Sequence, residues 1–228
     1  MVIQICPEHV ATIMQQLLKH YVAPPQFPPA TITFITFPLI DTIPEKTLLQ
    51  LKQEQNRTQA TITAQYTGAE QLHHLYQLVQ HHFERLDALL DQGIAGGPQW
   101  LIEPAIAQIV SDALTEFNGR YYRMFGYCIM PNHVHLIIER SNAVPMYQYS
   151  LARLIKRFKG QTGRLANEVI NRSGPFWHLD HYEYPIYRAG EAERVLTYTQ
   201  HNPVRAGLVS HPREWPYRFD IAEEWREW

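Results

Sequence analysis

The chain has 228 residues, of which 45% are hydrophobic and 18% are charged, and its formal net charge at pH 7 is −2. This composition excludes a disordered, collagen-like or low-complexity chain, and no apolar run reaches the roughly 18 residues that a membrane-spanning helix needs. The N-terminus has no basic flank before an apolar block, and the two cysteines, Cys6 and Cys128, cannot form a disulfide framework, so we expect a cytoplasmic protein without a membrane partner.

The first 93 residues alternate between helical periodicity and short strand-like runs. In chain order we expect a helix at residues 7–21, a proline-rich linker at 22–29, a strand at 31–37, a short helix at 44–55, a short strand at 60–66 and a helix from 67 to 93. The last helix is predicted to begin with a capping box, because Thr67 and Glu70 have the required spacing.

The rest of the chain adds two adjacent strands between helices. We expect a helix at 104–117, strands at 121–130 and 133–139, a helix at 151–170, a helix at 191–199, and irregular structure elsewhere, with a turn at Asn202-Pro203. The strands are too few for a doubly wound sheet, so the pattern predicts an α+β fold.

The expected helix at 151–170 carries a concentration of positive charge. Between residues 151 and 172 there are six basic residues and one acidic residue, Glu168. Leu154, Ile155 and Phe158 belong to the apolar stripe of this helix, which leaves the basic residues on its other side. Such a stripe on a near-neutral protein fits a face that contacts phosphates, and a solvated helix surface is the alternative.

The segment after Pro131-Asn132 contains the most informative pair of residues, His133 and His135. Residues two apart in a strand point to the same face, so two imidazoles are expected side by side while Val134 and Leu136 face the core. Two neutral imidazoles in this arrangement can bind a divalent metal. Two unrelated histidines on a half-exposed strand are the alternative.

Several motifs together resemble one protein family. They are Met-Pro-Asn-His-Val-His-Leu at 130–136, Gly-Pro-Gln-Trp-Leu at 97–101, Arg-Ser-Gly-Pro-Phe-Trp at 172–177, Tyr-Glu at 182–183, Tyr198 with Asn-Pro-Val-Arg-Ala-Gly-Leu-Val at 202–209, and Trp-Pro-Tyr at 215–217. In this combination and order they resemble the single-tyrosine HUH (His-hydrophobic-His) transposases, especially the REP-associated tyrosine transposases.

The resemblance implies a ferredoxin-like antiparallel sheet with the two histidines on a central strand, packed by helices. It divides the chain into an N-terminal helical extension with its linker (1–30), an HUH domain (31–217) with a helical insertion at about 40–95, and a C-terminal tail (218–228). It also implies cleavage and transfer of single-stranded or hairpin DNA, with Mg²⁺ or Mn²⁺ on the scissile phosphate and a tyrosine that forms a 5′-phosphotyrosine link. Relatives often work as homodimers.

The sequence departs from the family pattern at the catalytic tyrosine. The resemblance puts this tyrosine on the helix at 151–170, where the chain has Gln161 instead. Substitutes include Tyr149 and Tyr182; the other nearby tyrosines are Tyr147, Tyr184 and Tyr187. Each of them also fits a packing or base-stacking role. Asn167 matches a position that places an amide near the metal in relatives, so Asn167 or Gln161 could complete the coordination.

Three functions therefore remain open from the sequence: a metal-dependent transposase, a hairpin-DNA-binding protein that has lost strand transfer, and a nuclease that uses water as the nucleophile. In each of them the partner is DNA. The residues expected to contact it are Arg153, Lys156, Arg157, Lys159, Arg164, Arg188 and Arg205.

Overall fold

The computed structural model describes residues 32–93, 97–140, 150–187 and 190–221. The expected helix at 7–21, the linker at 22–29, Tyr147, Tyr149 and Arg188 lie outside this part of the chain. Among the described helices, none combines the length and the apolar character needed to cross a membrane.

The described elements alternate between strands and helices. In chain order they are β1 (Ile32–Pro38), α2 (Glu45–Gln65), α3 (Gly68–Gln92), the 3₁₀ turn η1 (Trp100–Ile102), α4 (Pro104–Phe117), β2 (Arg123–Ile129), β3 (His133–Glu139), α5 (Leu151–Val169), β4 (Tyr182–Ile186), α6 (Glu191–Arg205), η3 (Pro212–Glu214) and β5 (Arg218–Asp220).

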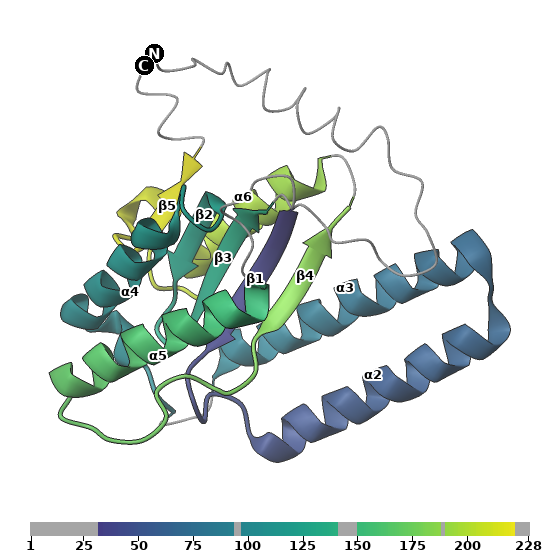
Figure 1. The fold of residues 1–228 in the computed structure, drawn as a ribbon, viewed down its shortest axis with the longest axis horizontal. Coiled ribbons are helices and arrows are strands. Elements are labelled where there is room, and N and C mark those ends of the chain that lie inside the picture. The colour runs from purple at the N-terminus through teal and green to yellow at the C-terminus, as the bar shows by residue number, and fades with distance from the viewer. Residues whose placement is uncertain (1–31, 94–96, 141–149, 188–189, 222–228) are drawn as a thin grey trace, which may run out of the picture.

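The strands form one antiparallel sheet in the order β4-β1-β3-β2-β5 (Figure 1). The first four strands have the 4-1-3-2 order of a ferredoxin-like fold, and β5 extends the edge beside β2. The α+β prediction is therefore confirmed, and β3, which carries both histidines, is the central strand.

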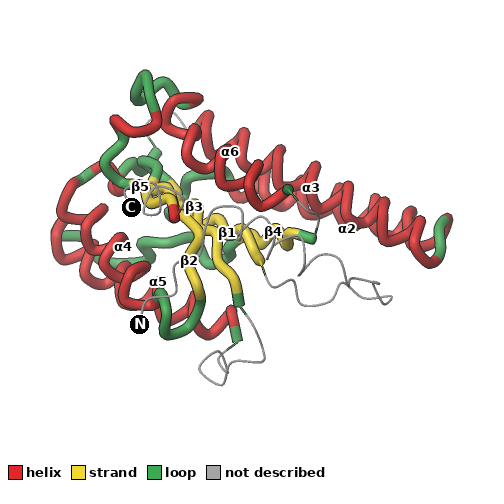
Figure 2. The backbone as a smooth tube through the Cα atoms, turned by 90° about the horizontal axis from the view of Figure 1, so that it is seen from above, coloured by secondary structure: helices red, strands yellow, loops and turns green. Residues whose placement is uncertain are grey.

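Each face of the sheet is covered by a different pair of helices (Figure 2). Side chains alternate along β3, so Val134, Leu136 and Ile138 pack in the same cluster as the apolar residues of α4 and α5. Ile137 points to the other face, where it packs with residues of α3 and α6. The two histidines have the same strand parity as Ile137. They therefore face α3 and α6, and α5 lies on the opposite side of the sheet.

Helices α2 and α3 form a long antiparallel hairpin that extends beyond the sheet (Figure 1). The strand expected at 60–66 is wrong, because residues 60–65 continue α2. The β-branched residues Thr61, Ile62 and Thr63, which suggested a strand, are accommodated in this helix. Ile62 is buried, while the Thr61 and Thr63 hydroxyls donate to the carbonyls of Arg57 and Gln59 one turn earlier.

Four further elements differ from the sequence expectation. The segments of β4 and β5 were expected to be irregular or part of the tail, yet both strands pair at the edges of the sheet. Pro185 is tolerated in β4 because an edge strand needs fewer backbone N–H donors. The turn expected at Asn202-Pro203 is instead the last turn of α6. Thr67 is the N-cap residue of α3, but its side chain makes no capping hydrogen bond, so the expected capping box is absent.

A close approach between β2 and α6 depends on Gly126. A Cβ atom at this position would lie 2.5 Å from Leu196 Cδ1 and 2.9 Å from the Phe219 carbonyl oxygen. Because the second contact is with the backbone of β5, we expect Gly126→Ala to lower the free energy of unfolding by about 1–3 kcal/mol, measured by urea denaturation.

Gly160 on α5 is the matched control for this prediction. A Cβ atom added at Gly160 would have no heavy atom within 4 Å outside its own helix turn, so Gly160→Ala is expected to raise the free energy of unfolding by up to about 1 kcal/mol. Equal urea midpoints for the two variants would show that Gly126 does not set the approach of α6.

Candidate metal centre

Two buried imidazoles lie at the centre of the site. The ring centroids of His133 and His135 are 4.5 Å apart, and their Nε2 atoms are 3.0 Å apart. Both residues are at most 1% exposed, but the groups around them are polar. Burial lowers the pKa of His133 to about 3, with His135 as the second cause, so His133 is neutral at pH 7.

The Nδ1 atoms of both rings are held by side-chain oxygens. His133 Nδ1 is 2.7 Å from Asn132 Oδ1, and His135 Nδ1 is 3.0 Å from the Thr36 hydroxyl on β1. Asn132 is itself oriented, because its Nδ2 donates to the Leu90 carbonyl at 2.9 Å. Such partners fix the rings of metal-binding histidines and direct their Nε2 lone pairs toward the ion.

Three groups from different elements converge on His135 Nε2. They are His133 Nε2 at 3.0 Å, Asp87 Oδ1 from α3 at 3.2 Å and Asn202 Nδ2 from α6 at 3.0 Å. One ring nitrogen has a single in-plane position for a proton or a partner, so it cannot satisfy all three groups. A cation between them would bind the two imidazole nitrogens and the Asp87 carboxylate oxygen.

Buried oxygens without hydrogen-bond donors support the same conclusion. Within the described part of the chain, neither carboxylate oxygen of Asp87 accepts a hydrogen bond, and neither does Asn202 Oδ1, although both residues are at most 1% exposed. Burial acts to raise the pKa of Asp87, but the attraction of His135, His133 and Arg205 outweighs it and lowers that pKa overall. A buried, ionised carboxylate without a hydrogen-bond donor is well suited to bind a cation.

These residues fit a divalent metal. The ligand atoms of Asp87, His133 and His135 lie within 4.8 Å of one another, and the Asn202 amide adjoins them. Imidazole nitrogen combined with carboxylate oxygen suits first-row divalent ions such as Mn²⁺.

A tyrosine and an arginine lie beside this cluster. Tyr198 is one turn before Asn202 on α6, and its ring centroid is 6.4 Å from that of His135. The Arg205 guanidinium lies 4.5 Å from the centre of the Tyr198 ring and 3.6 Å from a carboxylate oxygen of Asp91. Burial and the nearby Asp87 raise the pKa of Asp91 to about 6, although His135 and Arg205 oppose this shift.

The structure does not bring the expected residues of α5 to the histidines. Gln161 lies 3.5 Å from a carboxylate oxygen of Glu116 on α4, and a tyrosine at this position would face the same way. Asn167 donates to the Gly174 carbonyl at 2.8 Å and accepts from Arg172. Both residues belong to the helix on the opposite face of the sheet, so neither can complete a site at His133 and His135.

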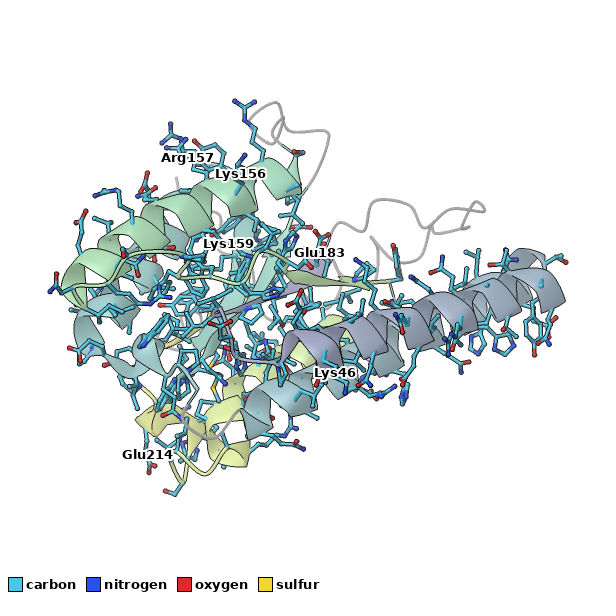
Figure 3. The ribbon with its side chains drawn as sticks, turned by 90° about the horizontal axis from the view of Figure 1, so that it is seen from below. Lys46, Lys156, Arg157, Lys159, Glu183 and Glu214 are labelled. Carbon is cyan, nitrogen blue, oxygen red and sulfur yellow. The ribbon has the colours of Figure 1, made fainter. Side chains whose placement is uncertain are left out.

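The expected DNA-contacting residues are divided between the two faces. Figure 3 shows Lys156 and Arg157 projecting from α5 away from the sheet. Lys159 instead donates its ammonium to the carbonyls of residues 178, 179 and 180, and Arg164 is paired with Glu168 at 2.6 Å. Among the members of the set that the structure describes, Arg205 lies at the histidine site.

Of the two substitute tyrosines, Tyr182 lies in the described part of the chain. It is half-buried on β4 and packs against the small cluster that contains Leu86 and Leu90. Burial raises its pKa to about 12. It is separated from β3 by β1, whereas Tyr198 makes a ring contact with His135.

Sequence reasoning missed Asp87, Asn202 and Tyr198 as partners of the histidine pair. The signal for Asp87 was its place on the apolar stripe of α3 between Leu86 and Leu90, where a charged residue needs a reason. Tyr198 and Asn202 are four residues apart, which places them on one helix face once α6 is known to continue to Arg205.

Comparison with known proteins shows which family the chain is similar to. No protein-family profile matches the chain. A curated REP-associated tyrosine transposase of Haemophilus influenzae is 25% identical over 121 residues, which are 47% of this chain and 69% of the relative. The chain is thus similar to the REP-associated tyrosine transposases. The resemblance drawn from the motifs is thereby confirmed.

One solved structure of this family also matches. It is a REP-associated tyrosine transposase bound to a REP hairpin, and the match has a TM-score of 0.42 and 14% sequence identity. It covers 87% of this chain and 82% of the solved chain.

Proposed function

We propose that this protein cleaves and rejoins single-stranded or hairpin DNA at a divalent metal held by Asp87, His133, His135 and Asn202. The observation that carries the proposal is the convergence of two imidazole nitrogens with a buried carboxylate and amide that lack hydrogen-bond donors. Mg²⁺ or Mn²⁺ bound there would polarise the scissile phosphate and offset its charge in the transition state. The relationship to the transposases supports the same chemistry.

Tyr198 is the proposed nucleophile in place of a residue on α5. Its ring lies against His135, and the Arg205 guanidinium lies over the ring, where it can meet the charge of a phosphate. The Tyr198 hydroxyl oxygen would attack phosphorus and lose its proton to solvent, the bond from phosphorus to the 3′ oxygen would break, and the 3′ oxygen would take up a proton. The products are a 5′-phosphotyrosine and a free 3′ hydroxyl, and attack by another 3′ hydroxyl reverses the step and rejoins the strand.

DNA would then contact both faces of the molecule. On the histidine side, Arg205 is 47% exposed at its side chain and is placed to meet a phosphate next to Tyr198. On the opposite side, the exposed Arg153, Lys156 and Arg157 would contact more distant phosphates. Lys159 has a structural role through its three carbonyl partners. A homodimer remains a prediction from the family.

The proposal is tested by incubating the protein with Mn²⁺ and an end-labelled hairpin oligonucleotide with single-stranded flanks. We expect a covalent protein–DNA adduct on a denaturing gel, with no adduct in EDTA. The double variant His133→Ala/His135→Ala should form no adduct because both imidazole ligands are lost.

The two alternative functions give different products in this assay. Free cleaved ends without an adduct would indicate hydrolysis by water, and a gel shift with intact DNA would indicate binding alone. Either result would contradict the proposed strand transfer.

A further inference from the structure

Helix α6 carries the site residues Tyr198 and Asn202 on one face, and the acidic residue Glu191 lies on the same face near the start of the helix. Tyr198 and Asn202 are 7 and 11 residues after Glu191, close to two and three full helical turns. All three side chains therefore lie on the same side of α6. Glu191 is the first residue of the helix, about 16 Å along the axis from Asn202 at 1.5 Å per residue.

Glu191 is buried and accepts hydrogen bonds from two tyrosines. The hydroxyl of Tyr184 on β4 donates to its Oε1 at 2.5 Å, and the hydroxyl of Tyr76 on α3 donates to its Oε2. The two hydroxyl oxygens are 3.0 Å apart. Burial, followed by the bonds to Glu191 and Tyr184, raises the pKa of Tyr76, which keeps this donor protonated.

The same spacing recurs on α3, the helix that packs with α6 on this face of the sheet. Asp87 is 11 residues after Tyr76 on α3, as Asn202 is 11 residues after Glu191 on α6. Helices α3 and α6 are thus bridged at two levels three turns apart. Tyr76 and Glu191 form one level, and Asp87 and Asn202 meet around His135 at the other.

We propose that Glu191 is a positioning residue that sets the axial register of α6 against α3 and β4, and so holds Asn202 and Tyr198 opposite Asp87 and the histidines. The part of this inference that concerns strand cleavage rests on the proposed function. The part that concerns metal affinity does not require cleavage. Hydrogen bonds to a buried carboxylate are directional and costly to break, which suits them to fix a helix in one register.

The test removes both hydroxyls without removing the rings, in the double variant Tyr76→Phe/Tyr184→Phe. The matched control is Tyr122→Phe, because the buried Tyr122 hydroxyl donates to the Leu114 carbonyl at 2.9 Å among residues packed on the opposite face. The measurements are the melting temperature, the Mn²⁺ dissociation constant from the electron paramagnetic resonance of free Mn²⁺, and kcat and KM for hairpin cleavage.

We expect the melting temperature to fall in the double variant and in Tyr122→Phe. The Mn²⁺ affinity and kcat should fall about tenfold in the double variant alone, and its KM for DNA should not change. Mn²⁺ affinity and kcat equal to those of Tyr122→Phe would overturn the inference and leave Glu191 a purely structural role. If the wild-type protein binds Mn²⁺ but does not cleave, the proposed function fails while the Mn²⁺ affinities still decide this inference. If the double variant does not fold, the same comparison is made with Tyr184→Phe.

Discussion

Tyr198→Phe is expected to abolish the covalent protein–DNA adduct and to lower strand cleavage at least about 10³-fold. The phenol oxygen is the proposed nucleophile, and phenylalanine retains the ring that contacts His135 and Arg205. Fold and Mn²⁺ affinity should therefore change little. The measurement is adduct formation with a labelled hairpin, together with the Mn²⁺ dissociation constant of the same preparation.

Two further variants make this prediction specific to Tyr198. Tyr182→Phe should retain the adduct, because β1 separates β4 from the strand that carries the histidines. Adding Gln161→Tyr to Tyr198→Phe should not restore it, because position 161 faces Glu116 on the other side of the sheet. Restoration by Gln161→Tyr, or an adduct that survives Tyr198→Phe, would refute the assignment of Tyr198.

The second large effect is expected at Asp87. Asp87→Asn removes the charge of a proposed metal ligand while keeping its shape, so the Mn²⁺ affinity should fall by at least about 10–100-fold in isothermal titration calorimetry. Asp112→Asn is the control, because Asp112 is an exposed acidic residue on α4 with Gln108 as its partner. Its Mn²⁺ affinity should match that of the wild type.

Stability without metal should fall as well. Burial at Asp87 is outweighed, chiefly by His135, and the pKa of its carboxyl is lowered in the folded protein. Folding therefore favours the ionised form, and the neutral replacement should lower the free energy of unfolding in EDTA at pH 7 by about 1–3 kcal/mol. The measurement is urea denaturation, with Asp112→Asn again as the control. A gain of stability for Asp87→Asn in EDTA would show that the carboxylate has no stabilising partner in the metal-free protein.

The sequence predicted those helices and strands that are determined by neighbouring residues in the chain. Strand β3 begins and ends at the predicted residues, His133 and Glu139, because an apolar alternation follows a clear turn signal. The limits of α4 were also correct, since Pro104 and Gly119 mark its ends. The strand-like residues at 60–66 were misassigned because Ile62 is buried as part of helix α2, which local propensity cannot reveal.

The site was only partly predictable because its ligands come from three elements far apart in the chain. The histidine pair follows from strand parity alone. Asp87 reaches it through the packing of α3 across the sheet, and Asn202 through a helix that continues beyond an Asn-Pro pair typical of a turn. Helix α3, which falls within the insertion predicted at 40–95, thus supplies both Asp87 and the Leu90 carbonyl that orients Asn132.

The placement of the expected tyrosine on α5 failed for a topological reason. A helix that follows β3 can cover either face of the sheet, and the sequence does not say which. The apolar stripe of α5 packs against Val134, Leu136 and Ile138, so this helix is on the face away from the histidines. Helix α6 covers the other face and brings Tyr198 to His135.

Pulsed electron paramagnetic resonance of the protein loaded with one equivalent of Mn²⁺ tests the central claim most directly. The account predicts one bound ion with nitrogen couplings from two imidazoles, and the loss of one set of these couplings in either single variant, His133→Ala or His135→Ala. Bound Mn²⁺ without imidazole nitrogen couplings, or no tightly bound Mn²⁺, would contradict it.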